Sequence, residues 1–181
     1  VVFESVRMGL LGLARAARTA ARAGIEFNAQ IEQQTQALQT LMGSADAARA
    51  RMAELVGFSA RTPFQFTEVV QANRLLQTFG GEILATNEAL RLVGDAAAAS
   101  GRGFQEVAMW VGRLYSGLQA GQPVGEATMR LLEMGVMSAR TKSRIEEMSG
   151  TALSSGDAMS VLQDAFSATS GAMEQQAQTF N

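Results

Sequence analysis

Small and apolar residues recur at spacings of three and four over the first 38 positions, and this repeat constrains the fold more than any other feature. It comprises Val2, Val6, Leu10, Leu13, Ala17, Ala20, Gly24, Phe27, Ile31, Thr35 and Leu38. Such spacings place side chains on one helix face, so the sequence predicts a single amphipathic helix over residues 1–42. At about 1.5 Å per residue this helix is about 60 Å long, too long for the rest of the chain to cover. We therefore expect it to associate with another chain.

Four arginines share the opposite face of this helix, within about 80° of one another. They are Arg7, Arg15, Arg18 and Arg22. The stripe is either a solvated polar face or a contact for an acidic protein surface or nucleic acid. The formal net charge of −2 gives no sign of a dedicated binder of nucleic acid or anionic membrane, so we expect no specific nucleic-acid site.

The remaining residues read as shorter helices separated by glycines, and no stretch alternates with the period of two that a strand requires. Ser44 is placed to cap the second helix, which is expected to end at Gly57. Thr62 or Thr67 is placed to cap the third helix, which is expected to end at Gly80 and Gly81. A helix is expected near residues 83–97, with Ile83, Leu90, Val93 and Ala97 on its apolar face. Further helices are expected near residues 104–118, 124–135, 136–148 and 158–180. The cleanest apolar stripe comprises Phe104, Val107, Ala108, Val111, Leu114, Tyr115 and Leu118.

The predicted fold class is all-α, a multi-helix bundle with a long N-terminal amphipathic helix. Residues 1–42 form an association arm, residues 43–150 the bundle, and residues 151–181 a helical segment leading into the rest of a longer protein. The first residue, Val1, also leads us to expect a segment of a longer chain. No stretch reaches the roughly 20 apolar residues of a transmembrane helix.

Catalytic and metal-binding signals are weak. The chain has no Cys and no His, which removes disulfides, thiolate chemistry and the commonest general base and metal ligand. The adjacent Glu146 and Glu147 point about 100° apart on a helix, so we interpret them as an exposed charged face, and Lys142 as a surface residue. We expect no catalytic residues, no metal site, no cofactor and no enzymatic activity.

One connector concentrates aromatic residues. The segment FSARTPFQF, residues 58–66, holds one of two prolines and three of nine phenylalanines. Pro63 restrains Thr62 to extended geometry and separates two helices, while Phe64 and Phe66 would lie on one side of the connector. The aromatic pair is either a structural staple or a partner-binding tip. Trp110, at the edge of its helix's apolar face, is likewise either half-buried packing or a partner contact.

Several motifs in a shared order resemble the N-terminal conserved domain of phage tail tape measure proteins. The first lies in LMGSADAARARMAELVGFSARTPFQFTEVVQANRLLQTFG, with Gly43-Ser44, then Thr62-Pro63-Phe64, then Leu76 through Gly80. The second lies in GRLYSGLQAGQPVGEATMRLLEMGV, where the matching residues are Gly125, Glu126, Leu131, Gly135 and Val136. The ending GAMEQQAQTFN resembles the run-up to a further family motif. The resemblance spans roughly residues 27–181, and SARTKSRIEEM departs from it by its charge.

The resemblance implies a structural virion protein that lies in the lumen of the tail tube, sets tail length during assembly and leaves ahead of the DNA at infection. It also implies assembly in the host cytoplasm, including from prophages. Its partners would be other copies of the chain through a coiled coil of the N-terminal helix, tail tube and tail tip or baseplate proteins, and tail assembly chaperones. The alternatives are a bacterial helical adaptor or secreted interaction module, and an enzyme whose site the sequence does not reveal.

Overall fold

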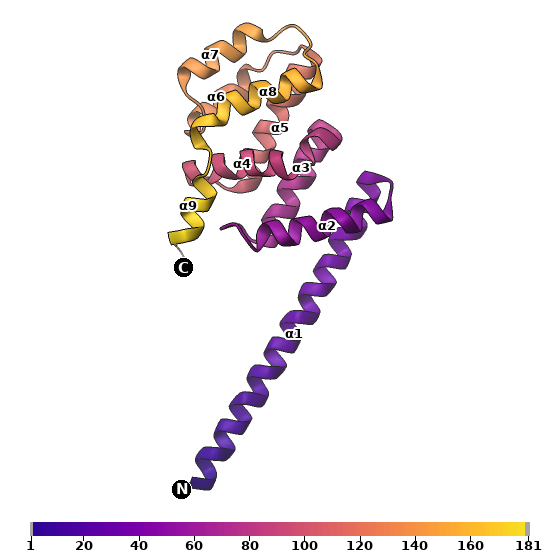
Figure 1. The fold of residues 1–181 in the computed structure, drawn as a ribbon, viewed down its shortest axis with the longest axis vertical. Helices are drawn as coiled ribbons and strands as arrows, with labels where there is room; N and C mark the ends of the chain where they lie inside the picture. Colours follow the sequence, from indigo (N-terminus) through magenta and orange to yellow (C-terminus); the bar gives the residue numbers. More distant parts are fainter. Residues whose placement is uncertain (1, 180–181) are drawn as a thin grey trace. The chain divides into compact units, whose positions relative to one another are not determined.

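The computed structural model describes residues 2–179 of the 181-residue chain, and the side chains of Thr19 and residues 21–179. All regular secondary structure in this part of the chain is helical (Figure 1). The helices are α1 (Val2–Met42), α2 (Ala45–Ser59), α3 (Phe66–Leu84), α4 (Asn87–Ser100), α5 (Phe104–Ala120), α6 (Gly125–Glu133), α7 (Ala139–Met148), α8 (Ser155–Phe166), the 3-10 turn η1 (Ser167–Thr169) and α9 (Ala172–Thr179). The predicted all-α class, a multi-helix bundle with a long N-terminal helix, is confirmed.

The chain divides into two compact units, Val1–Met52 and Ala53–Asn181, whose boundary falls inside α2. The first unit contains α1, one continuous helix of 41 residues. The second unit contains α3 to α9, so the C-terminal helices α8 and α9 pack with the same unit as α3 to α7. The sequence had placed its boundaries after residues 42 and 150.

Helix α5 is the centre of the second unit, because it contacts α3, α4, α6 and α8. Every residue of its predicted apolar stripe, from Phe104 to Leu118, is fully buried. Its most extensive contact is with α3, and Gly112 makes this contact close. A Cβ atom at Gly112 would lie 2.5 Å from Cδ2 of Phe79, so any side chain there would push α3 away.

The start of α3 differs from the prediction. The residue before the helix is Gln65, and its backbone N–H donates to Oε2 of Glu68 at 2.8 Å. Gln65 therefore stands at the capping position, and the prediction of Thr62 or Thr67 as the cap is wrong. The Glu68 bond to the Gln65 backbone is one half of a capping box. Phe66 consequently begins the helix and does not lie on the extended connector with Phe64.

The end of α3 also explains an error in the predicted core. Helical geometry breaks at Gly81, with φ 58° and ψ −141°, and a further turn continues to Leu84. This break buries Leu84 and leaves Ile83 42% exposed. Ile83 is therefore not part of the buried face of the following helix, contrary to the prediction. Helix α4 begins only after Thr86, whose hydroxyl accepts the Ala89 N–H at 3.1 Å.

The other helix starts follow ordinary capping chemistry. The hydroxyl of Ser44 accepts the Ala47 N–H at 3.3 Å, which confirms the predicted cap of α2, although this helix ends at Ser59 and not at Gly57. Ser138 and Ser154 cap α7 and α8 in the same way, each at 3.1 Å. These short polar side chains satisfy backbone donors that the first helical turn leaves free.

Candidate interaction surfaces

No catalytic constellation is found in the part of the chain that the structure describes. No group of three or more Asp or Glu residues is placed to hold a metal ion there. Glu146 and Glu147 do not form a catalytic pair, because the carboxylate of Glu146 is already engaged by two neighbouring side chains. The surfaces described below are candidates for binding.

The Glu146 carboxylate joins α6 to α7. It accepts the Thr128 hydroxyl at 2.8 Å through Oε1 and the Lys142 ammonium at 2.7 Å through Oε2. The lysine bond, followed by the threonine bond, lowers the pKa of Glu146 below its ordinary value. Glu147 is exposed, as predicted, whereas Glu146 and the predicted surface residue Lys142 are partly covered, with 31% and 18% of their side chains exposed.

The aromatic connector is anchored at Phe64. The centroid of its ring lies 4.5 Å from that of Phe104, the first residue of α5. The ring centroid of Phe58, at the end of α2, lies 6.5 Å from the same Phe104 ring. Thr62 and Pro63 are half-buried. The contact with a fully buried phenylalanine favours the staple interpretation for Phe64. Phe66 is half-buried in the first turn of α3.

A groove of about 650 Å³ lies beside this connector. Its walls come from the end of α2 and the connector, from α4, and from the segment that runs from α8 into α9. The buried side chains of Phe58, Phe166 and Met173 form its apolar part. The Oγ1 atom of Thr62, which also lines the groove, is buried without a hydrogen-bond partner among the described residues. Sequence reasoning missed this groove, because its residues come from three stretches that are distant in the sequence.

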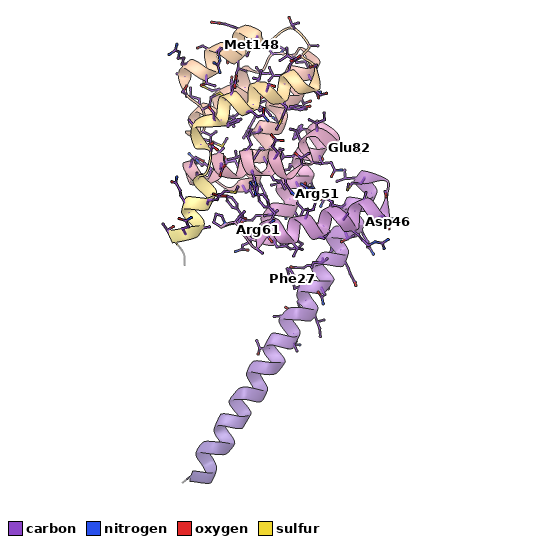
Figure 2. The ribbon with its side chains drawn as sticks, in the orientation of Figure 1. Phe27, Asp46, Arg51, Arg61, Glu82 and Met148 are labelled. Atoms are coloured by element: carbon purple, nitrogen blue, oxygen red, sulfur yellow. The ribbon has the colours of Figure 1, made fainter. Side chains whose placement is uncertain are left out.

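The charges around the groove are mixed. Arg61 and Arg91 line it together with Glu88, Asp95 and Glu174 (Arg61 is labelled in Figure 2). Two of the carboxylates are engaged: Glu88 accepts from Nε2 of Gln163 at 2.7 Å, and Asp95 accepts two backbone N–H groups. With both signs present, the groove's charge selects neither an anionic nor a cationic ligand.

Trp110 is half-buried, and its indole lies beneath two arginines. The guanidinium carbon of Arg113 is 4.9 Å and that of Arg130 5.8 Å from the ring centroid, within cation–π range. Each arginine also faces a carboxylate, Glu126 at 3.9 Å and Glu133 at 3.0 Å. The charges are therefore balanced within the cluster. These contacts within the chain explain the half-buried position of Trp110. A contact between Trp110 and a partner stays a prediction.

Helix α1 carries the remaining predicted candidates. The side chains of Val6, Leu10 and Leu13, like those of Arg7, Arg15 and Arg18, lie outside the described residues. Every described side chain between Thr19 and Gln30 is exposed, including Arg22, Ile25 (69%) and Phe27 (39%; Figure 2). Ile31 is half-buried, and Leu38 is fully buried. The predicted stripe is thus covered in its last part and open before it.

Comparisons with known proteins identify no relative. No family model matches the chain, and neither a curated protein nor a solved structure is significantly similar to it. Among the described residues, no helix is long and apolar enough to cross a membrane.

Proposed function

We propose that this chain is a segment of a phage tail tape measure protein with a structural, non-enzymatic role. Two kinds of observation support the proposal. The first is the ordered series of motifs that resembles the family, including Thr62-Pro63-Phe64 and Gly125-Glu126. The second, which carries it, is the open stretch of α1: a helix whose described side chains from Thr19 to Gln30 are all exposed.

Such a stretch calls for a partner. A helix gains most of its stability in water from packing of its apolar face, and intrinsic propensity is a weaker source. The sequence of this stretch does not compensate, because Gly24 in a helix interior costs about 1 kcal/mol relative to alanine. Three large apolar side chains of α1 are partly or largely exposed: Ile25 at 69%, Leu41 at 44% and Phe27 at 39%.

The spacing of the apolar surface of α1 indicates that the partner is another helix. The positions of this surface alternate in steps of three and four residues: Gly24, Phe27, Ile31, the polar Gln34, Leu38 and Leu41. This is the seven-residue repeat of helices that supercoil around one another. In the sequence the same register continues back to Leu10. A second copy of the chain, carrying the same repeat, is the simplest matching partner.

In this account the arm assembles the protein, and the compact unit Ala53–Asn181 presents surfaces to tail tube proteins, tail tip or baseplate proteins and assembly chaperones. The protein acts in the lumen of the tail tube, after assembly in the host cytoplasm. Its parent chain sets the length of the tail and leaves before the DNA. No cofactor takes part, and the chain catalyses no reaction.

The test uses the phage or prophage that encodes the chain. Mass spectrometry of purified tails is expected to find this segment within a longer helical protein. In-frame deletions and duplications in the remainder of that protein are expected to shorten and lengthen the tail in proportion, as measured by electron microscopy. Tails of unchanged length, or tails that lack the segment, would overturn the proposal in favour of a bacterial adaptor or secreted interaction module.

A further inference from the structure

The C-terminal helix α9 packs against α4 (Figure 1). Met173 is the one residue of α9 that is buried, at 5% exposure. It fits against Gly94 on α4: a Cβ atom there would lie 2.4 Å from Sδ and 3.1 Å from Cε of Met173. A side chain at position 94 would therefore fill this notch and require the end of the Met173 side chain to shift.

A single carboxylate holds the start of the same helix. Oδ2 of Asp95 accepts the N–H of Gly171 and Oδ1 accepts the N–H of Met173, both at 3.0 Å. These donors are among those that the first turn of a helix leaves unpaired, and the negative charge favours the helix dipole. Neighbouring residues of α4 thus supply both the notch and the cap, from a position more than 75 residues away in the sequence.

The helix before α9 is attached independently. Leu162 and Phe166 of α8 are buried, and Gln163 donates to Glu88 of α4 at 2.7 Å. The link from α8 to α9 is the short turn η1 followed by Gly171, whose φ of +83° suits a glycine hinge. Helix α9 can therefore leave α4 by rotation at this link while α8 stays in place.

We infer that α9 is a releasable strap, which opens and closes on α4 without unfolding the rest of the compact unit. In the closed state Met173 and Gly171 border the groove of about 650 Å³. Opening uncovers the notch at Gly94 and widens access to the buried rings of Phe58 and Phe166. The inference does not depend on the proposed function.

Amide hydrogen exchange of the full chain, followed by mass spectrometry under native conditions, tests this inference. Regions that open locally exchange with a smaller free energy than those that need global unfolding. We expect the amides of residues 175–179 to be at least about 100-fold less protected than those of α5. Equal protection of the two helices would show that α9 opens only when the whole unit unfolds, and would overturn the inference.

Two variants separate the strap from general destabilisation. Gly94→Ala forces the Met173 side chain to shift and is expected to lower protection of α9 by a further factor of about ten, while protection of α5 changes little. Met173→Ala removes the side chain that fits against Gly94, and it is also expected to lower the protection of α9. The matched control is Gly156→Ala on α8, where a Cβ atom meets nothing within 4 Å, and it should leave α9 unchanged. If both Gly94→Ala and Met173→Ala lower protection of α5 as much as that of α9, the strap does not exist.

Discussion

Helices α5 and α1 carry the same kind of apolar repeat and meet different surroundings. In α5 the stripe from Phe104 to Leu118 is buried against four neighbouring helices. In α1 the stripe is fully buried at Leu38 and 39% exposed at Phe27, only eleven residues earlier. Periodicity therefore predicts which residues share a helix face, whereas what covers that face is decided by the rest of the chain or by a partner.

The largest expected effect comes from the aromatic residue at the start of α5. Phe104→Ala removes a fully buried ring that contacts both Phe58 and Phe64, and should lower the free energy of unfolding by about 3–5 kcal/mol. The matched substitution in α1, Phe27→Ala, should cost less than about 1 kcal/mol at concentrations too low for self-association. Urea denaturation followed by circular dichroism measures both. Equal costs would show that the two stripes are packed alike.

The connector should give an intermediate effect. Phe64 is half-buried against Phe104, so Phe64→Ala is expected to cost about 1–3 kcal/mol while the helix content stays nearly unchanged. Pro63→Ala should cost less than about 1 kcal/mol, chiefly by loosening the unfolded chain. A melting temperature of Phe64→Ala equal to that of the wild type would favour the partner-binding tip over the staple.

The smallest effect concerns the carboxylate that joins α6 to α7. Because folding lowers the pKa of Glu146, its contribution is present above the ordinary value of 4.5 and is lost as the pH falls through the lower, folded pKa. With its side chain 31% exposed, the contribution should be at most about 1 kcal/mol. Glu146→Gln should therefore destabilise the protein slightly at pH 7, and the difference from the wild type should shrink in acid. A difference that grew on acidification would contradict this assignment.

The sequence predicts local features of the fold well and distant contacts poorly. Every residue of the α5 stripe is assigned correctly, because an uninterrupted helix of 17 residues follows its own period. Ile83 is misassigned because the break at Gly81 shifts the register, and burial passes to Leu84. The threonine cap of α3 is wrong because the helix begins at Phe66, which leaves Gln65, and neither Thr62 nor Thr67, at the capping position.

The candidate surfaces show the same limit. The anchoring role of Phe64 could be proposed from an aromatic cluster beside a proline. The groove beside it could not, since Arg61, Arg91 and Phe166 come together only through the packing of the connector, α4 and α8. Asp95 likewise carries no local sign that it caps a helix starting at Ala172. Tertiary contacts of this separation leave no periodic signal in a single sequence.

Self-association through α1 is the central claim, and sedimentation velocity over a range of concentrations tests it most directly. The wild-type chain is expected to form a discrete oligomer. The double variant Leu10→Glu, Leu13→Glu should yield a folded monomer, and so should Phe27→Glu alone, because burying a charge in an apolar seam is costly. Ile25→Glu is the matched control, since Ile25 is 69% exposed and lies about 120–160° around the helix from Ile31 and Phe27. It should leave the oligomer intact. A wild-type chain that stays monomeric at high concentration and binds no tail protein through residues 1–42 would contradict the account.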